Sequence, residues 1–234
     1  MQKCSKEALK LKLDNDAIKK SMLLYAITDR GWLKEGETLE SVVEDVLKSG
    51  ATFLQLREKI QGHEEIVKTA INLQTLCKKY NVPFVVNDDI MAAKEIDADG
   101  VHIGQSDMEY TKAREILGPD KIIGVSAGNL AEAKEAERVG ADYIGVGAVF
   151  HTDTKKDATS LTMAQLKEIS EEVSIPVVAI GGISIDNALE LKGTGIDGIC
   201  VISAIFGSEN PSEATKKLLD LSKQIISVSY THLT

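Results

Sequence analysis

The sequence predicts a (β/α)8 TIM barrel of the α/β class, with one extra helix before its first strand. Short apolar runs rich in β-branched residues alternate with longer segments of helical period, which is the pattern of repeated βα units around a parallel sheet. A weak internal repeat also recurs before every second run. Eight similar units would produce that spacing, whereas an open, doubly wound sheet of five or six strands would not, so we favour the barrel.

Eight strands are expected in chain order, followed in several places by clear helical period. The strands centre on residues 24–27, 53–56, 84–86, 100–103, 122–125, 143–146, 177–180 and 199–202. The clearest helices lie at 64–79, 131–139 and 163–173, where charged residues occupy one face and Leu, Ile or Ala the other. The repeat consists of Gly50-Ala51-Thr52, Ala98-Asp99-Gly100, Gly140-Ala141-Asp142 and Gly195-Ile196-Asp197. Each copy is expected to end a helix and open a strand, because glycine suits a left-handed helix cap.

The chain is expected to form one domain with two extensions. Residues 1–22 are a helical extension with a polar amphipathic helix at 5–20, and residues 23–226 form the barrel. Residues 227–234 have neither periodicity nor a charged side chain, so we expect a tail that is either disordered or foreign to the natural protein. A length of 234 residues suits a single barrel with one core.

Composition and charge exclude several function classes. The chain is 43% hydrophobic and 27% charged, which is typical of a globular protein, and no apolar run approaches the length of a membrane span. The N-terminus carries charges where a signal peptide would be apolar, so we expect a cytoplasmic protein. A net charge of −9 without a basic patch argues against nucleic acid. Three distant cysteines predict reduced thiols, with Cys77 and Cys200 in the core.

Polar residues at the end of the second strand conflict with a packed barrel interior. Side chains alternate along a strand, so Gln55, Arg57 and Lys59 share one face while Leu54 and Leu56 pack against helices on the other. A salt-bridged rim would explain one arginine. Two cations at the carboxyl end of a barrel strand favour a functional site, because that end carries the active sites of such barrels.

Carboxylates follow the third and fourth strands. Magnesium takes oxygen ligands and binds through one or two carboxylates, with water and substrate phosphate completing its shell. We therefore predict Asp88 and Asp107 as ligands of Mg²⁺, with helix capping as the alternative. For Asp89 capping is the better interpretation, and His102 is expected to be a hydrogen-bonded interior residue.

Donor-rich loops follow the remaining strands. Ser126 follows the fifth strand, and the loop at 151–157 offers hydroxyls and Lys155, which suit phosphate or diphosphate oxygens unless the loop is merely solvated. Gly181-Gly182 and Ile202-Ser203 follow the last two strands, each expected just before a helix start. Phosphate sites in barrels are often built there, although an isolated Gly-Gly could be only a tight turn.

These motifs, taken in order, resemble those of the thiamin-phosphate synthase family. They are QLREK at 55–59, NDD at 87–89, VHIGQSD at 101–107, GVSA at 124–127, TDTKKDA at 152–158, IGGI at 180–183 and VISAI at 201–205. The resemblance implies a transferase that condenses 4-amino-2-methyl-5-(diphosphomethyl)pyrimidine with 4-methyl-5-(2-phosphoethyl)thiazole, or its carboxylated form. The products would be thiamin phosphate and diphosphate. Many members have proline where this chain has His151, which bears on the loop's conformation.

The resemblance also implies a role for each matching residue. The pyrimidine diphosphate would be held by Gln55, Arg57, Lys59, Asn87, Ser126 and Lys155, of which Arg57, Lys59, Ser126 and Lys155 would be catalytic. The thiazole phosphate would be held by Thr152, Thr154, Gly182, Ile202 and Ser203. Magnesium and fixed cations would stabilise the leaving diphosphate in a dissociative substitution. A thiazole tautomerase, a non-catalytic sensor of these phosphates and a phosphosugar-handling barrel remain alternatives, and the sequence does not indicate an oligomeric state.

Overall fold

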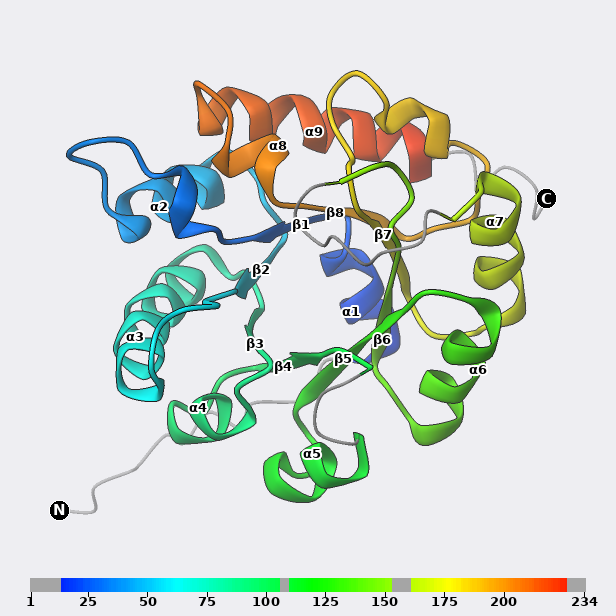
Figure 1. Cartoon of the computed structure of the whole chain (residues 1–234), viewed down its shortest axis with the longest axis horizontal. Coiled ribbons are helices and arrows are strands. Elements are labelled where there is room, and N and C mark those ends of the chain that lie inside the picture. The colour runs from blue at the N-terminus through cyan, green and yellow to red at the C-terminus, as the bar shows by residue number, and fades with distance from the viewer. Residues whose placement is uncertain (1–13, 106–109, 153–160, 227–234) are drawn as a thin grey trace, which may run out of the picture.

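Eight parallel strands close into a barrel in the order β1 to β8, with β8 pairing back to β1 (Figure 1). The computed structural model describes residues 14–105, 110–152 and 161–226. The strands are β1 (Leu24–Ile27), β2 (Phe53–Leu56), β3 (Phe84–Asn87), β4 (Gly100–Ile103), β5 (Ile122–Ala127), β6 (Tyr143–Val146), β7 (Val177–Ile180) and β8 (Gly198–Val201). The predicted (β/α)8 TIM barrel is therefore confirmed.

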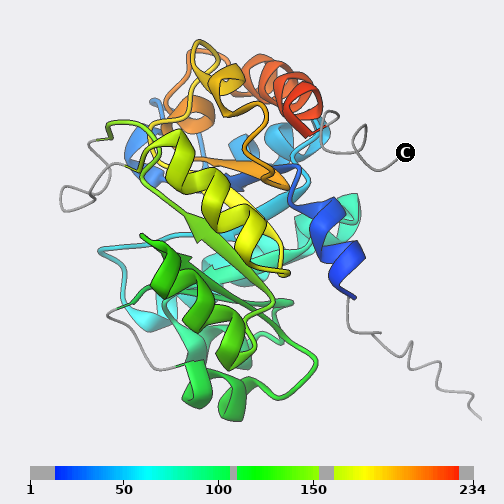
Figure 2. The same ribbon diagram turned by 90° about the vertical axis from the view of Figure 1, so that its right-hand side faces the viewer.

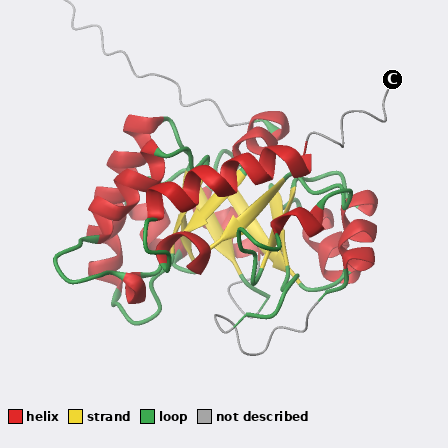
Figure 3. Cartoon of the chain, turned by 90° about the horizontal axis from the view of Figure 1, so that it is seen from above, coloured by secondary structure: helices red, strands yellow, loops and turns green. Residues whose placement is uncertain are grey.

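Helices surround the barrel on its outside, as the red ribbons around the yellow strands show (Figure 3). They are α2 (Leu39–Lys48), α3 (His63–Tyr80), α4 (Ile90–Glu95), α5 (Tyr110–Leu117), α6 (Leu130–Val139), α7 (Met163–Glu172), α8 (Ser203–Phe206) and α9 (Pro211–Ile226), with the 3-10 helices η1 (Arg30–Trp32) and η2 (Ala188–Leu191). Leu54 and Leu56 belong to the core layer between strands and helices, as the strand alternation predicts. Among the described residues, no helix is long and apolar enough to cross a membrane.

A second core fills the barrel interior, and helix α1 (Asn15–Ser21) closes it at one end (Figure 2). Ile18 and Met22 are fully buried there and belong to the same cluster as the inward-facing Tyr25. The expected single helix over 5–20 is interrupted at Asp14. Asp14 has an extended backbone and caps α1 by accepting a hydrogen bond from the Ala17 amide, so the helix begins at Asn15. The rest of that segment and the tail at 227–234 lie outside the described residues.

The internal repeat has a structural explanation at the amino-terminal end of the strands. In each copy, a side-chain oxygen just before an even-numbered strand accepts a hydrogen bond from a backbone amide near the start of the preceding strand. The pairs are Thr52 with Leu24, Asp99 with Phe84, Asp142 with Ile123 and Asp197 with Val177, all at 2.8–2.9 Å. The expected left-handed cap is present at Gly140 (φ 93°). In the second copy the residue just before the repeat, Asp97, adopts the left-handed conformation in place of a glycine (φ 52°). The repeat therefore stabilises the face opposite the catalytic end.

The segment after β7 differs from the prediction of a helix start directly after Gly181-Gly182. A turn follows instead, and only η2 forms before β8. The Asn187 side chain accepts a hydrogen bond from the Ser184 amide and donates one to the Gly182 carbonyl. These two bonds satisfy backbone groups that a helical turn would otherwise have paired.

Candidate active site

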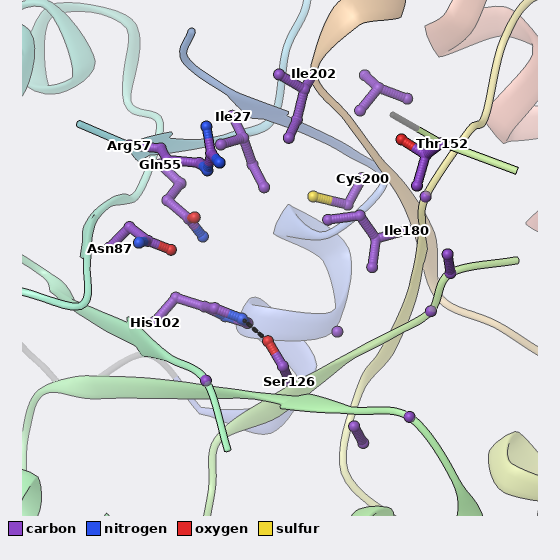
Figure 4. A pocket seen from close by; sticks show the side chains of 18 of the residues that line it. Ile27, Gln55, Arg57, Asn87, His102, Ser126, Thr152, Ile180, Cys200 and Ile202 are labelled. Atoms are coloured by element: carbon purple, nitrogen blue, oxygen red, sulfur yellow. Dashed lines mark hydrogen bonds between the residues drawn. The ribbon is translucent and has the colours of Figure 1, made fainter. Parts of the chain in front are cut away.

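A cavity of about 580 Å³ opens at the carboxyl end of the strands and takes lining residues from all eight strands or from the loops that follow them. Figure 4 shows these side chains converging on one space. The predicted site residues that the structure describes all line it: Gln55, Arg57, Lys59, Asn87, Asp88, Ser126, Thr152, Gly182, Ile202 and Ser203. Asp107, Thr154 and Lys155 lie outside the described residues. Barrel geometry thus brings together positions far apart in sequence.

Strand β2 places Gln55 deep and Arg57 higher in the cavity. Gln55 is almost completely buried, and its Nε2 donates a hydrogen bond of 2.5 Å to the Tyr25 hydroxyl. The Arg57 side chain is 21% exposed, and its Nη1 lies 4.0 Å from Asp29 Oδ2. The backbone amide of Arg57 donates to Thr28 Oγ1, which holds the strand end in place. An amide at the bottom and a guanidinium at the mouth suit a ligand with a polar ring and an anionic tail.

The carboxylates after β3 have separate roles. Asp88 lines the cavity, and its backbone takes the left-handed conformation (φ 63°) that Asp tolerates better than most residues. Asp88 Oδ2 accepts a hydrogen bond of 2.9 Å from Lys59 Nζ. Asp89 instead caps α4 by accepting a hydrogen bond from the Ala92 amide, so the capping prediction is confirmed. Only the first of these neighbouring carboxylates is therefore placed to meet a ligand.

The oxygen donors on this wall fit a hard divalent cation. Asp88 offers a carboxylate, and Asn87 and Gln105, which also line the cavity, carry amide oxygens. Among the described residues no three His, Cys, Asp or Glu side chains cluster in a way that could hold a metal. Mg²⁺ usually binds through one or two carboxylates and keeps waters and substrate phosphates as its other ligands, so Asp88 could serve as one ligand. The assignment of Asp107 as the second ligand stays a prediction.

His102 and Ser126 form the polar floor between β4 and β5. His102 Nε2 lies 3.0 Å from Ser126 Oγ, the contact drawn as a dashed line in Figure 4, and His102 Nδ1 lies 2.9 Å from the Tyr143 hydroxyl. The prediction of a hydrogen-bonded interior histidine is confirmed. Sequence reasoning missed Tyr25 and Tyr143, which lie directly beneath the cavity; their inward positions on β1 and β6 were the available signal.

Cys200 and two isoleucines are among the apolar residues of the wall. Ile27, Ile180 and Cys200 line the cavity, and Cys200 is 2% exposed. Burial raises the pKa of the Cys200 thiol well above its usual range, so it stays a neutral thiol. Cys77 is likewise buried, which confirms both cysteines as core residues. An uncharged sulfur in this position suits contact with a flat ring and is poorly suited to nucleophilic attack.

The opposite wall is made of backbone. Gly181 and Gly182 both have positive φ, and a Cβ on Gly182 would lie only 2.3 Å from the His151 carbonyl oxygen, so no other residue fits without a shift. Ile202 and Ser203 line the cavity where α8 begins. The first amides of a helix have no intrahelical partner, so this wall can offer N–H donors to an anion.

A closed (β/α)8 barrel with cations on one wall and a glycine-rich backbone on the other is an enzyme built for a small anionic substrate. The family model for thiamine monophosphate synthases matches residues 24–205. A thiamine-phosphate synthase of Clostridium botulinum is 50% identical over 195 residues, covering 83% of this chain and 91% of that protein. One from Methanobrevibacter smithii is 50% identical over 196 residues, covering 84% and 93%.

Solved structures agree with these sequence relatives. The thiamine phosphate pyrophosphorylase from Pyrococcus furiosus superposes with a TM-score of 0.83 at 42% identity, covering 89% of this chain and 99% of that one. The chain therefore belongs to the thiamine monophosphate synthase family and is a transferase.

Proposed function

We propose that this chain acts as a thiamine-phosphate synthase, joining the aminopyrimidine diphosphate to the thiazole phosphate and releasing diphosphate. One observation carries the proposal. Gln55, Arg57 and Lys59 share a cavity of about 580 Å³ with Gly182 and Ser203, so two anionic ligands can lie side by side in it. The chain is also about half identical to proteins that bear this name. The substrates are small and phosphorylated, and we propose that the protein works in the cytoplasm.

In this proposal each wall of the cavity binds one of the two substrates. Gln55, Asn87 and Ser126 hold the pyrimidine ring and its substituents, while Arg57, Lys59 and Lys155 hold the diphosphate. Thr152, Thr154, Gly182, Ile202 and Ser203 hold the thiazole phosphate. The division follows the chemistry of the walls, because guanidinium and ammonium groups suit a diphosphate and closely approaching amides suit a single phosphate. Asp88 and Asp107 would hold Mg²⁺.

The reaction breaks the bond between the pyrimidine methylene carbon and the diphosphate oxygen, and the electron pair leaves with the oxygen. Arg57 and Lys59 stand in the cavity before reaction, so they stabilise the growing negative charge without reorganising. Bound Mg²⁺ would neutralise part of the same charge. The aminopyrimidine can delocalise the positive charge left on its methylene, which favours a dissociative path. The thiazole nitrogen then forms the new C–N bond at a carbon held within reach.

No protein nucleophile is needed on this path. Ser126 contacts His102 Nε2, but His102 Nδ1 contacts the Tyr143 hydroxyl, where a catalytic triad would have a carboxylate, and Cys200 stays a neutral thiol. We assign Ser126 to binding and orientation of the pyrimidine, where its hydroxyl can meet a ring nitrogen or a diphosphate oxygen.

The direct test mixes the two substrates with Mg²⁺ and follows thiamin phosphate and diphosphate together. Equal amounts of both products are expected, and turnover should stop with excess chelator. A non-catalytic sensor would bind both ligands and release nothing, whereas a phosphosugar-handling barrel would bind sugar phosphates saturably instead of the thiazole phosphate. A thiazole tautomerase would convert the thiazole without consuming the pyrimidine. Product formation that chelator leaves undiminished would defeat the metal assignment.

A further inference from the structure

A continuous chain of hydrogen-bonded side chains crosses the barrel beneath the cavity. It runs from Gln55 Nε2 to the Tyr25 hydroxyl (2.5 Å), to the Tyr143 hydroxyl (2.8 Å), to His102 Nδ1 (2.9 Å), and from His102 Nε2 to Ser126 Oγ (3.0 Å). Gln55 and Ser126, its two ends, line the cavity, while the tyrosines are at most 1% exposed. The chain therefore joins two candidate substrate-binding residues through two buried tyrosines and through His102, which also lines the cavity.

Each interior link can donate only one proton onward. Burial is the main cause that raises the pKa of both tyrosines well above 10, so both stay protonated phenols. A neutral imidazole also carries a single N–H. When one member of such a chain donates in a given direction, the next must donate the same way, because two hydroxyls cannot both donate into one contact. The direction at one end thus determines the direction at the other.

The direction is set at Gln55, whose Nε2 donates to Tyr25. Tyr25 then donates to Tyr143, Tyr143 donates to His102 Nδ1, and His102 donates from Nε2 to Ser126. Ser126 accepts this bond and keeps its own hydroxyl proton for a ligand, and Gln55 keeps Oε1 as an acceptor beside the second hydrogen of its Nε2. In the reverse direction, Gln55 would offer a donor to the cavity and Ser126 only an acceptor.

We propose that Tyr25, Tyr143 and His102 are positioning residues that lock this direction and so set which end of the cavity floor donates and which accepts. An aminopyrimidine carries an amino group that donates and ring nitrogens that accept, which matches an acceptor at Gln55 and a donor at Ser126. This step rests on the proposed function, whereas the locked direction is a property of the protein alone. Two experiments separate these parts.

The first experiment is kinetic and uses Tyr143→Phe, which removes the central hydroxyl and keeps the ring. We expect kcat/KM for the aminopyrimidine diphosphate to fall about 10- to 100-fold, the usual effect of losing a group that orients a binding residue. The KM for the thiazole phosphate should change less than about twofold, because that substrate meets the opposite wall. Tyr25→Phe should act in the same direction.

The matched control is Phe53→Leu. The centroid of the Phe53 ring lies 4.5 Å from that of Tyr25 and 5.7 Å from that of Tyr143. Phe53 has no polar side-chain atom, so it is not a member of the hydrogen-bonded chain. The Phe53→Leu substitution therefore disturbs the same packing without breaking a hydrogen bond, and kcat/KM should stay within about threefold of the wild type. If Phe53→Leu reduces kcat/KM as much as Tyr143→Phe, packing alone explains the effect and the proposal falls.

The second experiment needs no substrate. Nitrogen NMR of the His102 ring, assigned by loss of its signals in His102→Gln, should show the proton on Nε2 in the wild type. An ionised Glu side chain accepts hydrogen bonds but does not donate them. Gln55→Glu should therefore reverse the direction of donation along the hydrogen-bonded chain and move the His102 proton to Nδ1. If Gln55→Glu does not fold, the wild-type spectrum decides alone, and a proton on Nδ1 or on both nitrogens overturns the proposal.

The two proposals fail differently. If the wild type makes no thiamin phosphate, the proposed function is wrong, and the NMR result still tests the direction of the chain. If the wild type is active and Tyr143→Phe retains full kcat/KM, the positioning role is wrong and the proposed function stands.

Discussion

Lys59 Nζ lies 2.9 Å from Asp88 Oδ2, so a cation that follows β2 and a carboxylate that follows β3 meet at the mouth of the cavity. Their side chains are 52% and 34% exposed. An ion pair this exposed contributes only about 0–1 kcal/mol to stability. The pair can therefore separate at little cost, which would free Lys59 for a diphosphate and Asp88 for a cation.

Asp88→Asn should abolish most of the activity and leave the fold intact. The amide keeps the shape and suits the left-handed backbone of this residue, but it loses the charge that attracts Mg²⁺. We expect kcat to fall about 100-fold or more, the scale for losing one fixed electrostatic contribution. The Mg²⁺ concentration needed for half-maximal rate should rise, as a metal titration of turnover would show.

The neighbouring residue provides the control. Asp89→Ala removes the cap of α4 and should destabilise the protein by about 1 kcal/mol in urea unfolding, with kcat within about threefold of the wild type. Asp88→Asn should instead lower kcat and leave the stability in urea unfolding nearly unchanged. Equal loss of turnover in both variants would mean that this loop acts only through its conformation.

The fold could be predicted because its signals are local. Strands buried on both faces appear as apolar runs, and all eight runs became strands. The strand alternation around Gln55 also identified which side chains face inward. The cap role of Asp89 followed from its place just before a helix.

Contacts between distant residues could not be predicted in the same way. Tyr25 and Tyr143 are 118 positions apart, and their hydrogen bond depends on the register of the closed barrel. The turn after β7 depends on two hydrogen bonds of one side chain, Asn187, which pattern alone does not indicate. The roles of Asp107, Thr154 and Lys155 stay predictions.

Gly182→Ala should weaken binding of the thiazole phosphate. Its backbone is left-handed (φ 65°), and the new methyl group would lie 2.3 Å from the His151 carbonyl oxygen, so this wall must move. We expect KM for the thiazole phosphate to rise at least about tenfold, since a shifted wall loses close amide contacts. Steady-state kinetics with the pyrimidine diphosphate saturating would measure this.

The control for backbone strain is Gly36→Ala. Gly36 has a similar positive φ of 83° with open space around it. It should lose about 1 kcal/mol of stability from strain and keep the KM of the wild type. A normal KM in Gly182→Ala would exclude this glycine from the phosphate site.

Asp142→Ala should destabilise the barrel more than Thr52→Val, although both remove the same repeated hydrogen bond. Asp142 is 6% exposed and also accepts a hydrogen bond of 2.6 Å from Arg114 Nη2. Its loss leaves a partly buried guanidinium without its carboxylate, at a cost of about 3 kcal/mol. Thr52→Val loses neutral hydrogen bonds and should cost about 1 kcal/mol. Chemical unfolding measures the stability that each variant loses. Equal losses would show that the ion pair of Asp142 with Arg114 adds nothing to the stability.

The stability contribution of His63 should decrease as pH rises. His63 Nδ1 lies 2.8 Å from Asp89 Oδ2 and Nε2 lies 3.2 Å from Glu95 Oε2, and the hydrogen bond to Asp89, followed by that to Glu95, raises the His63 pKa above 6.5. A pKa that is higher in the folded state means that folding favours the protonated form. Its stabilisation is fully present below the unfolded pKa and is lost as pH rises through the folded pKa.

Urea unfolding of the wild type and His63→Gln between pH 5.5 and 8.5, values that bracket the ordinary histidine pKa of about 6.5, measures this contribution. The difference between the two proteins should be largest at the acidic end and shrink toward the alkaline end. Glu95→Gln is the matched variant, because it leaves the cap of α4 intact while removing one of the two carboxylates that hold the proton. It should bring the His63 pKa, followed by proton NMR, part of the way back to 6.5. A difference that grows with pH would show that neutral His63 is the stabilising form, because then the ring would contribute through packing and not through its charge.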